Sequence, residues 1–421
     1  NNIDHQCDEA LSNWSGTCRI FNNQSIRWEP KSTPELLNLM EYYHTNRMKL
    51  RPIGSALSPN GVGFPHSKNG DILSLHQLNH ISVDVTNKLV TVGAGVTIND
   101  LLVQLKKFDL SLENFSSIKE QQVAGWTQVA AHGTGIRLAT VDDMIESLSL
   151  AVFEDGKDVR TPRILRISKH GEVVDDATNV PIHLKYGNKH SIEENNKSLF
   201  SMCKVGVGSL GIVTEMKLRC APLHTLEEHT NMLKISDFKK NHKNYMSGDS
   251  NNQYLNDHYN RLFENRHVRY MWLPYTDTVV SVTSNPSDDP IDTTMRSPNP
   301  LSNPSNSSTK ANTNSDVKDR ETTALKHLRN LLKEEELNPE RYYSFSELRG
   351  MLLNRRSTAQ IDERTGIRTE NDTLSLLDTA HIKQVNAAEA AYWNALGGSV
   401  RRGLSNDILG IVCEFFIGCS A

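Results

Sequence analysis

Apolar residues recur along the start of the chain in two patterns, one typical of helices and one typical of strands. Ser32 to Glu35 has the form of a capping box with proline in the first turn, and apolar residues from Leu36 to Tyr43 then share one helical face. The run from Met48 to Ile53 is typical of a buried strand and ends at a glycine-rich loop. The first unit is therefore predicted as helix, strand and glycine-rich loop.

The next patterns predict a hairpin and a second helix. Residues 81–85 and 89–92 read as strands on either side of a Thr-Asn-Lys turn, and the second strand runs into Gly93. Thr97 and Asp100 can cap the helix that follows. Strands, glycine-rich loops and short helices continue to about Cys220, which indicates an α+β or α/β domain.

The pattern changes near residue 223, where we expect a second domain to begin. The predicted domains are therefore residues 1–222, with a polar insertion at about 157–196, and residues 223–421. The second domain is expected to contain a strand, turn and strand at 268–282, a disordered Pro- and Ser-rich loop at about 285–316, and helices at 320–336, 344–354 and 380–396.

Composition and charge narrow the classes of function without selecting one. The formal net charge of −4 over 421 residues gives no reason to expect a nucleic-acid partner. No apolar run reaches the roughly 18 residues that a membrane-spanning helix needs. The six cysteines are scattered without a Cys-x-x-Cys motif, so we expect no metal site. Because the chain begins at Asn1 rather than Met, we expect that a leader was removed or that the sequence is partial.

Three glycine-rich stretches carry the candidate chemistry. The first reads Arg51-Pro52-Ile53-Gly54-Ser55-Ala56-Leu57-Ser58-Pro59-Asn60-Gly61. Its small residues would let consecutive backbone N–H groups turn toward one point and bind an anion. No Gly-Lys-Ser/Thr follows, so it is not a Walker loop. An ordinary surface turn is the alternative for this stretch taken alone.

The second stretch reads Gln121-Gln122-Val123-Ala124-Gly125-Trp126-Thr127-Gln128-Val129-Ala130-Ala131-His132-Gly133-Thr134-Gly135. Its small residues indicate close approach of the backbone to a flat or charged group, and His132 and Thr134 add polar atoms. Tight packing of a loop on a sheet would use the same small residues, so that alternative stays open.

The third stretch, residues 203–214, places Gly206, Gly208 and Gly211 at the spacing of a dinucleotide fingerprint. A Rossmann loop follows a strand and opens a helix, whereas residues 212–218 alternate like a strand. We therefore reject NAD binding and expect these glycines to let a strand pass under a large planar ligand. Three such stretches in one domain favour one large phosphate-bearing cofactor.

Together these stretches resemble the flavin-dependent aldonolactone oxidoreductases of the vanillyl-alcohol-oxidase superfamily, and most closely the plant-type galactonolactone dehydrogenases. The resemblance covers most of residues 12–155 and 197–285 and about 375–410. Its other motifs are Asn13-Trp14-Ser15-Gly16-Thr17, Asn114-Phe115-Ser116-Ser117-Ile118-Lys119-Glu120, Pro274-Tyr275-Thr276-Asp277-Thr278-Val279-Val280, Val385-Asn386-Ala387-Ala388-Glu389-Ala390 and Ser405-Asn406-Asp407-Ile408-Leu409-Gly410.

This resemblance implies an α+β fold, with a two-subdomain FAD-binding domain followed by an α+β cap domain over the flavin. It identifies no catalytic residue and no metal. The residues that it implies for FAD binding are Arg51, Pro52, Ile53, Gly54, Ser55, Ala56, Leu57, Ser58, Ser116, Ser117, Glu120, Gln121, Gln122, Gly125, His132, Gly133, Thr134, Gly135, Gly208, Gly211, Ile212 and Val213.

Two positions refine the expected chemistry. Relatives that attach flavin covalently carry His where this chain has Leu57, which has no nucleophilic nitrogen, so we expect non-covalent FAD. Relatives that react quickly with oxygen carry Gly at the position of Ser116, and dehydrogenases carry Ala. Because Ser is bulkier than Gly, we expect a dehydrogenase that passes electrons to cytochrome c.

Departures from the family pattern leave two hypotheses. The Glu–Arg pair that binds the lactone and the His-Trp-Ala-Lys signature of the family are not found, so the cap is expected to be partial. Ala124 and Trp126 replace the family's Gly and Ile. The first hypothesis is an aldonolactone dehydrogenase of ascorbate biosynthesis whose cap is completed by a second polypeptide or a continuation. The second is an inactive flavoprotein that serves as a structural or assembly component of mitochondrial complex I. Resemblance implies a mitochondrial location, on the intermembrane-space side of the inner membrane.

Overall fold

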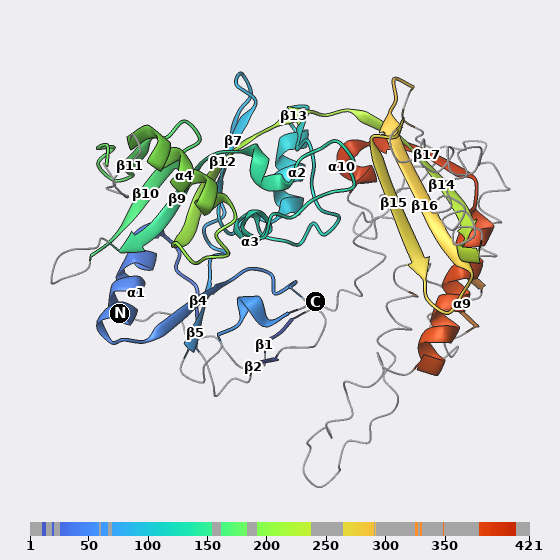
Figure 1. The fold of residues 1–421 in the computed structure, drawn as a ribbon, viewed down its shortest axis with the longest axis horizontal. Helices are drawn as coiled ribbons and strands as arrows, with labels where there is room; N and C mark the ends of the chain where they lie inside the picture. The colour runs from blue at the N-terminus through green and yellow to red at the C-terminus, as the bar shows by residue number, and fades with distance from the viewer. Residues whose placement is uncertain are drawn as a thin grey trace, which may run out of the picture. The chain divides into compact units, whose positions relative to one another are not determined.

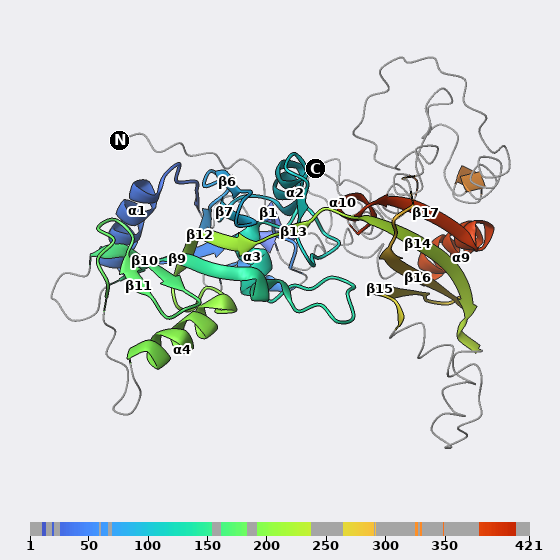
Figure 2. The same ribbon diagram turned by 90° about the horizontal axis from the view of Figure 1, so that it is seen from above.

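A computed structural model of the chain forms two compact units. The structure describes residues 11–13, 19–20, 26–58, 60–65, 70–153, 161–182, 192–236, 264–289, 291, 325–326, 329–330, 348 and 379–409. The first unit comprises Asn1–Gly133 and Leu138–Leu223, and the second comprises Thr134–Arg137 and His224–Ala421. Figures 1 and 2 show the elements of each unit.

A small parallel sheet opens the first unit. Its strands are β3 (Arg27–Trp28), β4 (Lys49–Ile53) and β5 (Gly70–Ser74), in the order β3-β5-β4. Helix α1 (Thr33–Thr45) precedes β4, and the Ser32 side chain caps it by accepting from the Glu35 amide, as the capping box predicted. Its buried residues Leu36, Leu39, Met40 and Tyr43 join one apolar cluster with Leu73. Nearby in the sequence, the short strands β1 (Leu11–Ser12) and β2 (Arg19–Ile20) pair with each other. The turn η1 (Gly61–Gly63) lies between β4 and β5 in the sequence.

A six-stranded antiparallel sheet forms the centre of the first unit. Its order is β11-β10-β9-β12-β7-β6, and β6 (Ile81–Asp84) and β7 (Leu89–Gly93) form the predicted hairpin. The other strands are β9 (Ile145–Phe153), β10 (Pro162–Ser168), β11 (Val173–Asp175) and β12 (Ile212–Arg219). The stretch expected as an insertion at about 157–196 thus supplies β10, which pairs with β9, and β11, which pairs with β10.

Short helices connect these strands. Helix α2 (Ile98–Lys106) is capped by Thr97, as predicted, and is followed by β8 (Leu110–Ser111), which pairs with β13 (Ala221–Pro222). Helix α3 (Val123–Gln128) and the turn η2 (Val141–Met144) lead into β9. Helix α4 (Ile192–Lys204) precedes β12 and lies against the sheet near β10 in Figure 2.

The second unit is built on a four-stranded antiparallel sheet. Its order is β15-β16-β14-β17, from β14 (Thr225–Lys234), β15 (His267–Leu273), β16 (Thr278–Pro286) and β17 (Ser399–Leu404). Strands β15 and β16 are the predicted strand, turn and strand. Helix α9 (Thr379–Leu396) is the helix expected at 380–396, and α10 (Ser405–Ile408) follows β17.

Several expectations fall on residues that the structure does not describe. Of the expected disordered loop at 285–316, only residues 285–289 and 291 are described, and residues 285 and 286 belong to β16. Of the helices expected at 320–336 and 344–354, only residues 325–326, 329–330 and 348 are described, and these are helical. The remainder of these three segments lies outside the described residues.

Candidate cofactor-binding site

The first glycine-rich stretch begins where a parallel strand ends. Strands β3, β5 and β4 run in the same direction, so the loop after Ile53 lies at the carboxyl edge of this sheet, the edge at which ligands bind in open parallel sheets. Ala56 has a φ of 54°, a left-handed conformation that few non-glycine residues adopt. Within the described residues, no hydrogen bond uses the backbone amides of Ser55, Ala56 or Leu57. The loop therefore presents free amides in a bent backbone, as an anion nest requires.

Side chains around this loop hold its two ends. Arg51 donates from Nε and a terminal nitrogen to the Val62 carbonyl at 3.0 Å and 2.5 Å, so its guanidinium is engaged by η1. Asn13 donates from Nδ2 to the Ser58 carbonyl at 2.9 Å. Pro52 and Ile53 lie within β4, and Ile53 is buried against Phe64 and Ile72. These contacts hold the backbone on both sides of residues 54–57.

Residues 116–122 lie directly beside the first loop. The Ser55 hydroxyl donates to the Glu120 carbonyl, and a Cβ placed on Gly54 would lie 3.6 Å from Gln122 Oε1. The backbone of 119–124 pairs with 94–99, for example from Ile98 N to the Gln121 carbonyl at 2.9 Å. The first loop and the start of the second stretch are therefore neighbours in the fold, although about sixty residues separate them in the sequence.

Ser116 is held in a short polar chain. Trp126 donates from Nε1 to Ser116 Oγ at 3.1 Å, and the Ser116 hydroxyl donates in turn to Gln121 Oε1. Trp126 is only 1% exposed, so its indole fills the core of the first unit and its one polar atom is satisfied by Ser116. Ser117 beside it is half-buried.

The second stretch forms a helix before it becomes a loop. Gly125 lies inside α3, and a Cβ placed there would meet no atom within 4 Å. Ala130 has a φ of 49°, the second left-handed alanine of the site. His132 is exposed, and its Nδ1 lies 2.9 Å from the Gly133 carbonyl. The small residues of this stretch thus serve a short helix and a sharp turn.

Gly133 makes the closest approach of the site. A Cβ there would lie 2.0 Å from Asn114 Oδ1 and 2.5 Å from the Phe115 carbonyl, so only glycine fits. Asn114 is 3% exposed and donates from Nδ2 to the Ala139 carbonyl at 2.9 Å. Its Oδ1 is buried without a hydrogen-bond partner in the part of the chain that the structure describes. An acceptor in this state indicates a missing donor.

Gln128 joins the end of α3 to the third stretch. Its Nε2 donates to the Cys203 carbonyl at 2.8 Å and to the Lys204 carbonyl at 3.2 Å, and its Oε1 accepts from the Gly208 amide at 3.4 Å. Gln128 is 8% exposed. One buried amide therefore fixes the position of the third stretch relative to the second.

The third stretch turns sharply and enters β12, the strand that the sequence predicted. Val207 and Gly208 have φ of 50° and 72°. Gly211 has a φ of 158°, and a Cβ there would lie 2.8 Å from the Ala151 carbonyl, so glycine is needed where β12 passes β9. Ile212 and Val213 begin β12 and pair with Ala151 and Leu150 of β9. Helix α4 comes before this turn and a strand after it, the reverse of a Rossmann order.

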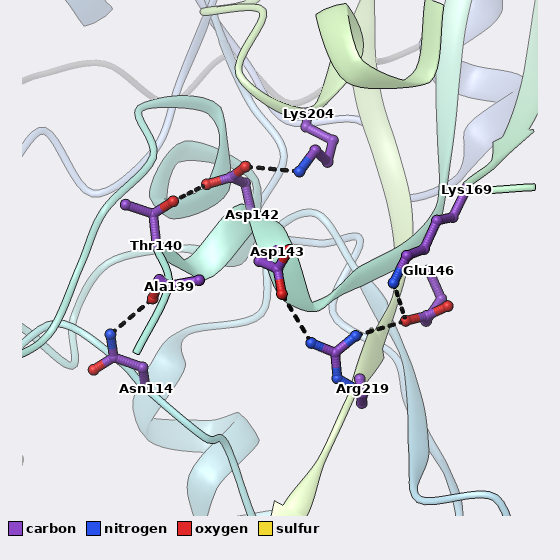
Figure 3. A network of polar contacts seen from close by, with 9 residues as sticks. All are labelled: Asn114, Ala139, Thr140, Asp142, Asp143, Glu146, Lys169, Lys204 and Arg219. Atoms are coloured by element: carbon purple, nitrogen blue, oxygen red, sulfur yellow. Dashed lines mark hydrogen bonds and ion pairs between the residues drawn. The ribbon is translucent and has the colours of Figure 1, made fainter. Parts of the chain in front are cut away.

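Ion pairs brace the segment that follows the second stretch (Figure 3). Lys204, at the end of α4, lies 2.9 Å from Asp142 Oδ2, and the Thr140 hydroxyl donates to Asp142 Oδ1 at 2.6 Å. Burial would raise the pKa of Asp142, but these two partners outweigh it and hold that pKa below its usual value. Arg219 bridges Asp143 at 3.0 Å and Glu146 at 2.9 Å. The turn η2 is thereby tied to both α4 and β12.

Thr134 and Gly135 are the predicted residues that leave the first unit. Gly135 forms a β-bridge with His267, and the Val268 amide donates to the Thr134 carbonyl at 3.1 Å, so both pair with β15 of the second unit. The other predicted cofactor residues lie in the first unit. Its described thiols, Cys203 and Cys220, are buried, and burial raises the pKa of Cys203 to about 11 and that of Cys220 to about 12. Both thiols are therefore protonated at neutral pH.

Two features of the site do not follow from the sequence: the left-handed backbone at three non-glycine residues, and the contacts of Gln128. Ala56, Ala130 and Val207 adopt left-handed backbone without being glycine, and sequence offers no local signal for this. Gln128 belongs to no recognised motif, and the only sequence signal for it is its position within the second glycine-rich stretch. Its role depends on a segment about eighty positions away.

Comparison with known proteins gives the relationships of the chain. Residues 25–162 match the family described as FAD binding domain. The chain is 32% identical over 414 residues to L-galactono-1,4-lactone dehydrogenase 2, mitochondrial, of Oryza sativa subsp. japonica. The aligned region covers 96% of this chain and 55% of that protein. It is 31% identical over 410 residues to L-galactono-1,4-lactone dehydrogenase, mitochondrial, of Arabidopsis thaliana, and that aligned region covers 96% of this chain and 54% of the Arabidopsis protein. Cholesterol oxidase from B. sterolicum superposes with a TM-score of 0.55 at 15% identity, over 94% of this chain and 60% of that chain.

These findings confirm the resemblance and the α+β fold with an FAD-binding domain. The homologues are plant L-galactono-1,4-lactone dehydrogenases, and the likeness to cholesterol oxidase concerns the fold alone. The chain spans just over half the length of the curated relatives that it matches. Among the described residues, no helix has the length and apolar character needed to cross a bilayer.

Proposed function

We propose that this chain is an FAD-dependent oxidoreductase that oxidises an aldonolactone. The observation that carries the proposal is the closeness of the first loop to residues 120–122: the Ser55 hydroxyl donates to the Glu120 carbonyl, and a Cβ on Gly54 would lie 3.6 Å from Gln122 Oε1. It brings together two stretches of the sequence that are each rich in small residues. The FAD binding domain match over residues 25–162 spans both of them.

The residues present fit a dinucleotide. The free amides of Ser55, Ala56 and Leu57 suit a pyrophosphate, which is anionic and binds best to converging N–H groups. Asn114 Oδ1, buried and unpartnered, is an acceptor that a ring N–H of the cofactor could satisfy. Residues 116–122 and 208–213, with Gly125, His132 and Gly133, would hold the remainder of the cofactor. FAD would supply the two-electron oxidising power, and this chain would bind and orient it.

The attachment of FAD is proposed to be non-covalent. Leu57, in the first loop, has a hydrocarbon side chain and no nucleophile. His132 is exposed, but it belongs to the second stretch. Denaturation and filtration should therefore release all flavin from the protein, and flavin retained on the unfolded chain would contradict this part of the proposal.

Dehydrogenase rather than oxidase character is proposed from Ser116. Its hydroxyl is fixed between Trp126 Nε1 and Gln121 Oε1, so its bulk cannot swing aside without breaking two hydrogen bonds. Electrons would pass to cytochrome c, on the intermembrane-space side of the inner mitochondrial membrane. The named plant relatives are mitochondrial, which supports the location.

The deciding experiment is anaerobic titration of the purified, FAD-loaded chain with L-galactono-1,4-lactone. We expect the visible absorption of oxidised flavin to disappear and cytochrome c to restore it faster than air does. Absence of bound flavin would overturn the cofactor proposal. Flavin that is bound but never reduced by lactone, even with partner polypeptides present, would instead support a cofactor-holding role in complex I assembly.

A further inference from the structure

A row of polar side chains crosses one face of the four-stranded sheet in the second unit. The sheet pairs His267 of β15 with Ser284 of β16, Ser284 with Glu228 of β14, and Glu228 with Arg401 of β17. Residues paired directly in an antiparallel sheet point to the same face. His267, Ser284 and Glu228 are 2%, 3% and 5% exposed. Polar groups thus occupy positions where a sheet normally buries apolar ones.

The row holds more positive than negative charge. Glu228 accepts from Arg401 at 2.6 Å and from Arg269 at 3.3 Å, and the Ser284 hydroxyl lies 3.4 Å from the same carboxylate. Arg269 is two residues beyond His267 on β15 and so shares its face. Neither arginine has another ion pair within the described part of the chain. Two guanidinium groups therefore share one carboxylate, which leaves a formal charge of about +1 at a largely buried position.

Unsatisfied nitrogen atoms accompany this charge. Nε of Arg269 and Nε2 of His267 are buried without a hydrogen-bond partner in the structure that is described. Burial, together with Arg266, His224 and Arg269, lowers the pKa of His267 to about 4, so its ring is neutral at neutral pH and adds no charge. Nε of Arg269 is therefore a desolvated donor without an acceptor, and such a group lowers stability until something accepts from it.

The row is open at the edge strand. The Arg401 side chain is 22% exposed and Arg269 is 14% exposed, whereas Glu228 is almost covered. A small molecule that enters from solvent would thus contact the guanidinium of Arg401 before it could approach the carboxylate of Glu228. Planar guanidinium groups recognise carboxylates in a bidentate way.

We propose that Arg401 and Arg269 form a binding site for a small organic carboxylate of the sugar-acid type. The anion would neutralise the unbalanced charge and accept from the unsatisfied Nε of Arg269. The choice of a sugar acid rests on the proposed function, because an aldonate is the ring-opened form of an aldonolactone. The alternative is an Arg–Glu–Arg triad that only braces β14, β15 and β17, an arrangement that proteins also bury without a ligand.

The test is calorimetric titration of the full chain with sodium L-galactonate, and separately with neutral L-galactono-1,4-lactone. The unmodified chain should bind the anion saturably and the lactone at least tenfold more weakly. Arg401→Met should weaken anion binding at least tenfold. The matched control is Arg402→Met, because Arg402 lies on the opposite face and pairs with Glu227 and Asp289.

A second variant separates ligand binding from bracing. Glu228→Gln removes the carboxylate that competes for both guanidinium groups and should tighten anion binding several-fold. The proposal is overturned by no saturable binding to the unmodified chain, by equal losses in the Arg401 and Arg402 variants, or by weaker binding in Glu228→Gln. Flavin reduction by lactone is a separate measurement, so failure of the anion site and failure of the proposed function can be told apart.

Discussion

At the scale of single residues, the space around Gly133 leaves no room for a side chain. A Cβ would press on Asn114 Oδ1 and on the Phe115 carbonyl, and the carbonyl cannot rotate away as a flexible side chain could. We expect Gly133→Ala to lower the free energy of unfolding by about 3 kcal/mol. Urea denaturation of the cofactor-free chain measures this. A change below about 1 kcal/mol would show that the segment 114–115 moves easily.

Gly125 provides the opposite case. A Cβ there meets nothing within 4 Å, and alanine favours helix over glycine, so Gly125→Ala should stabilise the cofactor-free chain by about 0.5–1 kcal/mol. If this exposed position faces bound FAD, the same methyl group should weaken FAD binding about tenfold, which is about 1.4 kcal/mol. Thermal denaturation and fluorescence titration with FAD measure the two effects separately. Unchanged affinity would remove Gly125 from the cofactor site.

These two glycines also show what a sequence can convey about single residues. Both lie in a run of small residues, which predicts close approach of the backbone to another group but does not identify that group. At Gly133 the neighbour is protein, the open alternative for this stretch. At Gly125 no protein atom is near, which leaves room for a ligand. Only the three-dimensional neighbours distinguish the two.

At the scale of elements, Gln128 connects α3 to the turn before β12. Gln128→Leu would remove three hydrogen bonds and leave the buried Cys203 carbonyl without its side-chain donor. We expect a loss of about 2 kcal/mol in the free energy of unfolding and roughly tenfold weaker FAD binding, because the third stretch would no longer be fixed. Equilibrium dialysis with FAD and urea denaturation give both numbers.

The control for this variant is Gln104→Leu on α2, where the side chain only accepts from exposed Lys107. It should change stability by less than about 0.5 kcal/mol and leave FAD affinity unaltered. If Gln128→Leu lowers stability but binds FAD normally, the bond from Gln128 braces the fold without positioning the cofactor.

Elements with strong local signals were predictable. The Ser32 cap, the hairpin of β6 and β7, the Thr97 cap and the strand β12 each depend on a few neighbouring residues. Helix α3 was not predicted, because Gln122 provides no side-chain cap. The helix is also only six residues long and contains Gly125, a residue that disfavours helix. The integration of β10 was also missed, because polar residues on both sides of it obscure the apolar Ile164, Leu165 and Ile167 that it buries.

At the scale of the whole molecule, His267 links stability to pH. Its pKa is about 4 in the folded chain and about 6.5 when unfolded, so between these values the unfolded state binds the extra proton. Stability from this group is complete above pH 6.5 and falls as the pH drops toward 4, by about 3 kcal/mol. Denaturation at a series of pH values should show this slope, and His267→Gln should flatten it.

The control for the pH effect is His229→Gln, because His229 is half-exposed beside Glu227 on the same sheet. Its removal should leave the slope between pH 4 and 6.5 largely intact. If the His267 and His229 variants have the same pH profile as the unmodified chain, burial of His267 does not control acid sensitivity.

Binding of FAD should stabilise the chain through mass action and leave a local signature. A ligand that binds only the folded state, at a hundred times its dissociation constant, adds about 2.7 kcal/mol. Because nearly all candidate residues lie in the first unit, hydrogen exchange should slow at residues 53–58, 116–128 and 204–213 when FAD is added. Strand β14 and strand β16 of the second unit, which contain no predicted cofactor residue, serve as the internal reference. Free amides at Ser55 to Leu57 must become protected from exchange when a pyrophosphate accepts hydrogen bonds from them. If the three stretches gain no protection, or gain no more than the reference strands, the cofactor binds through other residues.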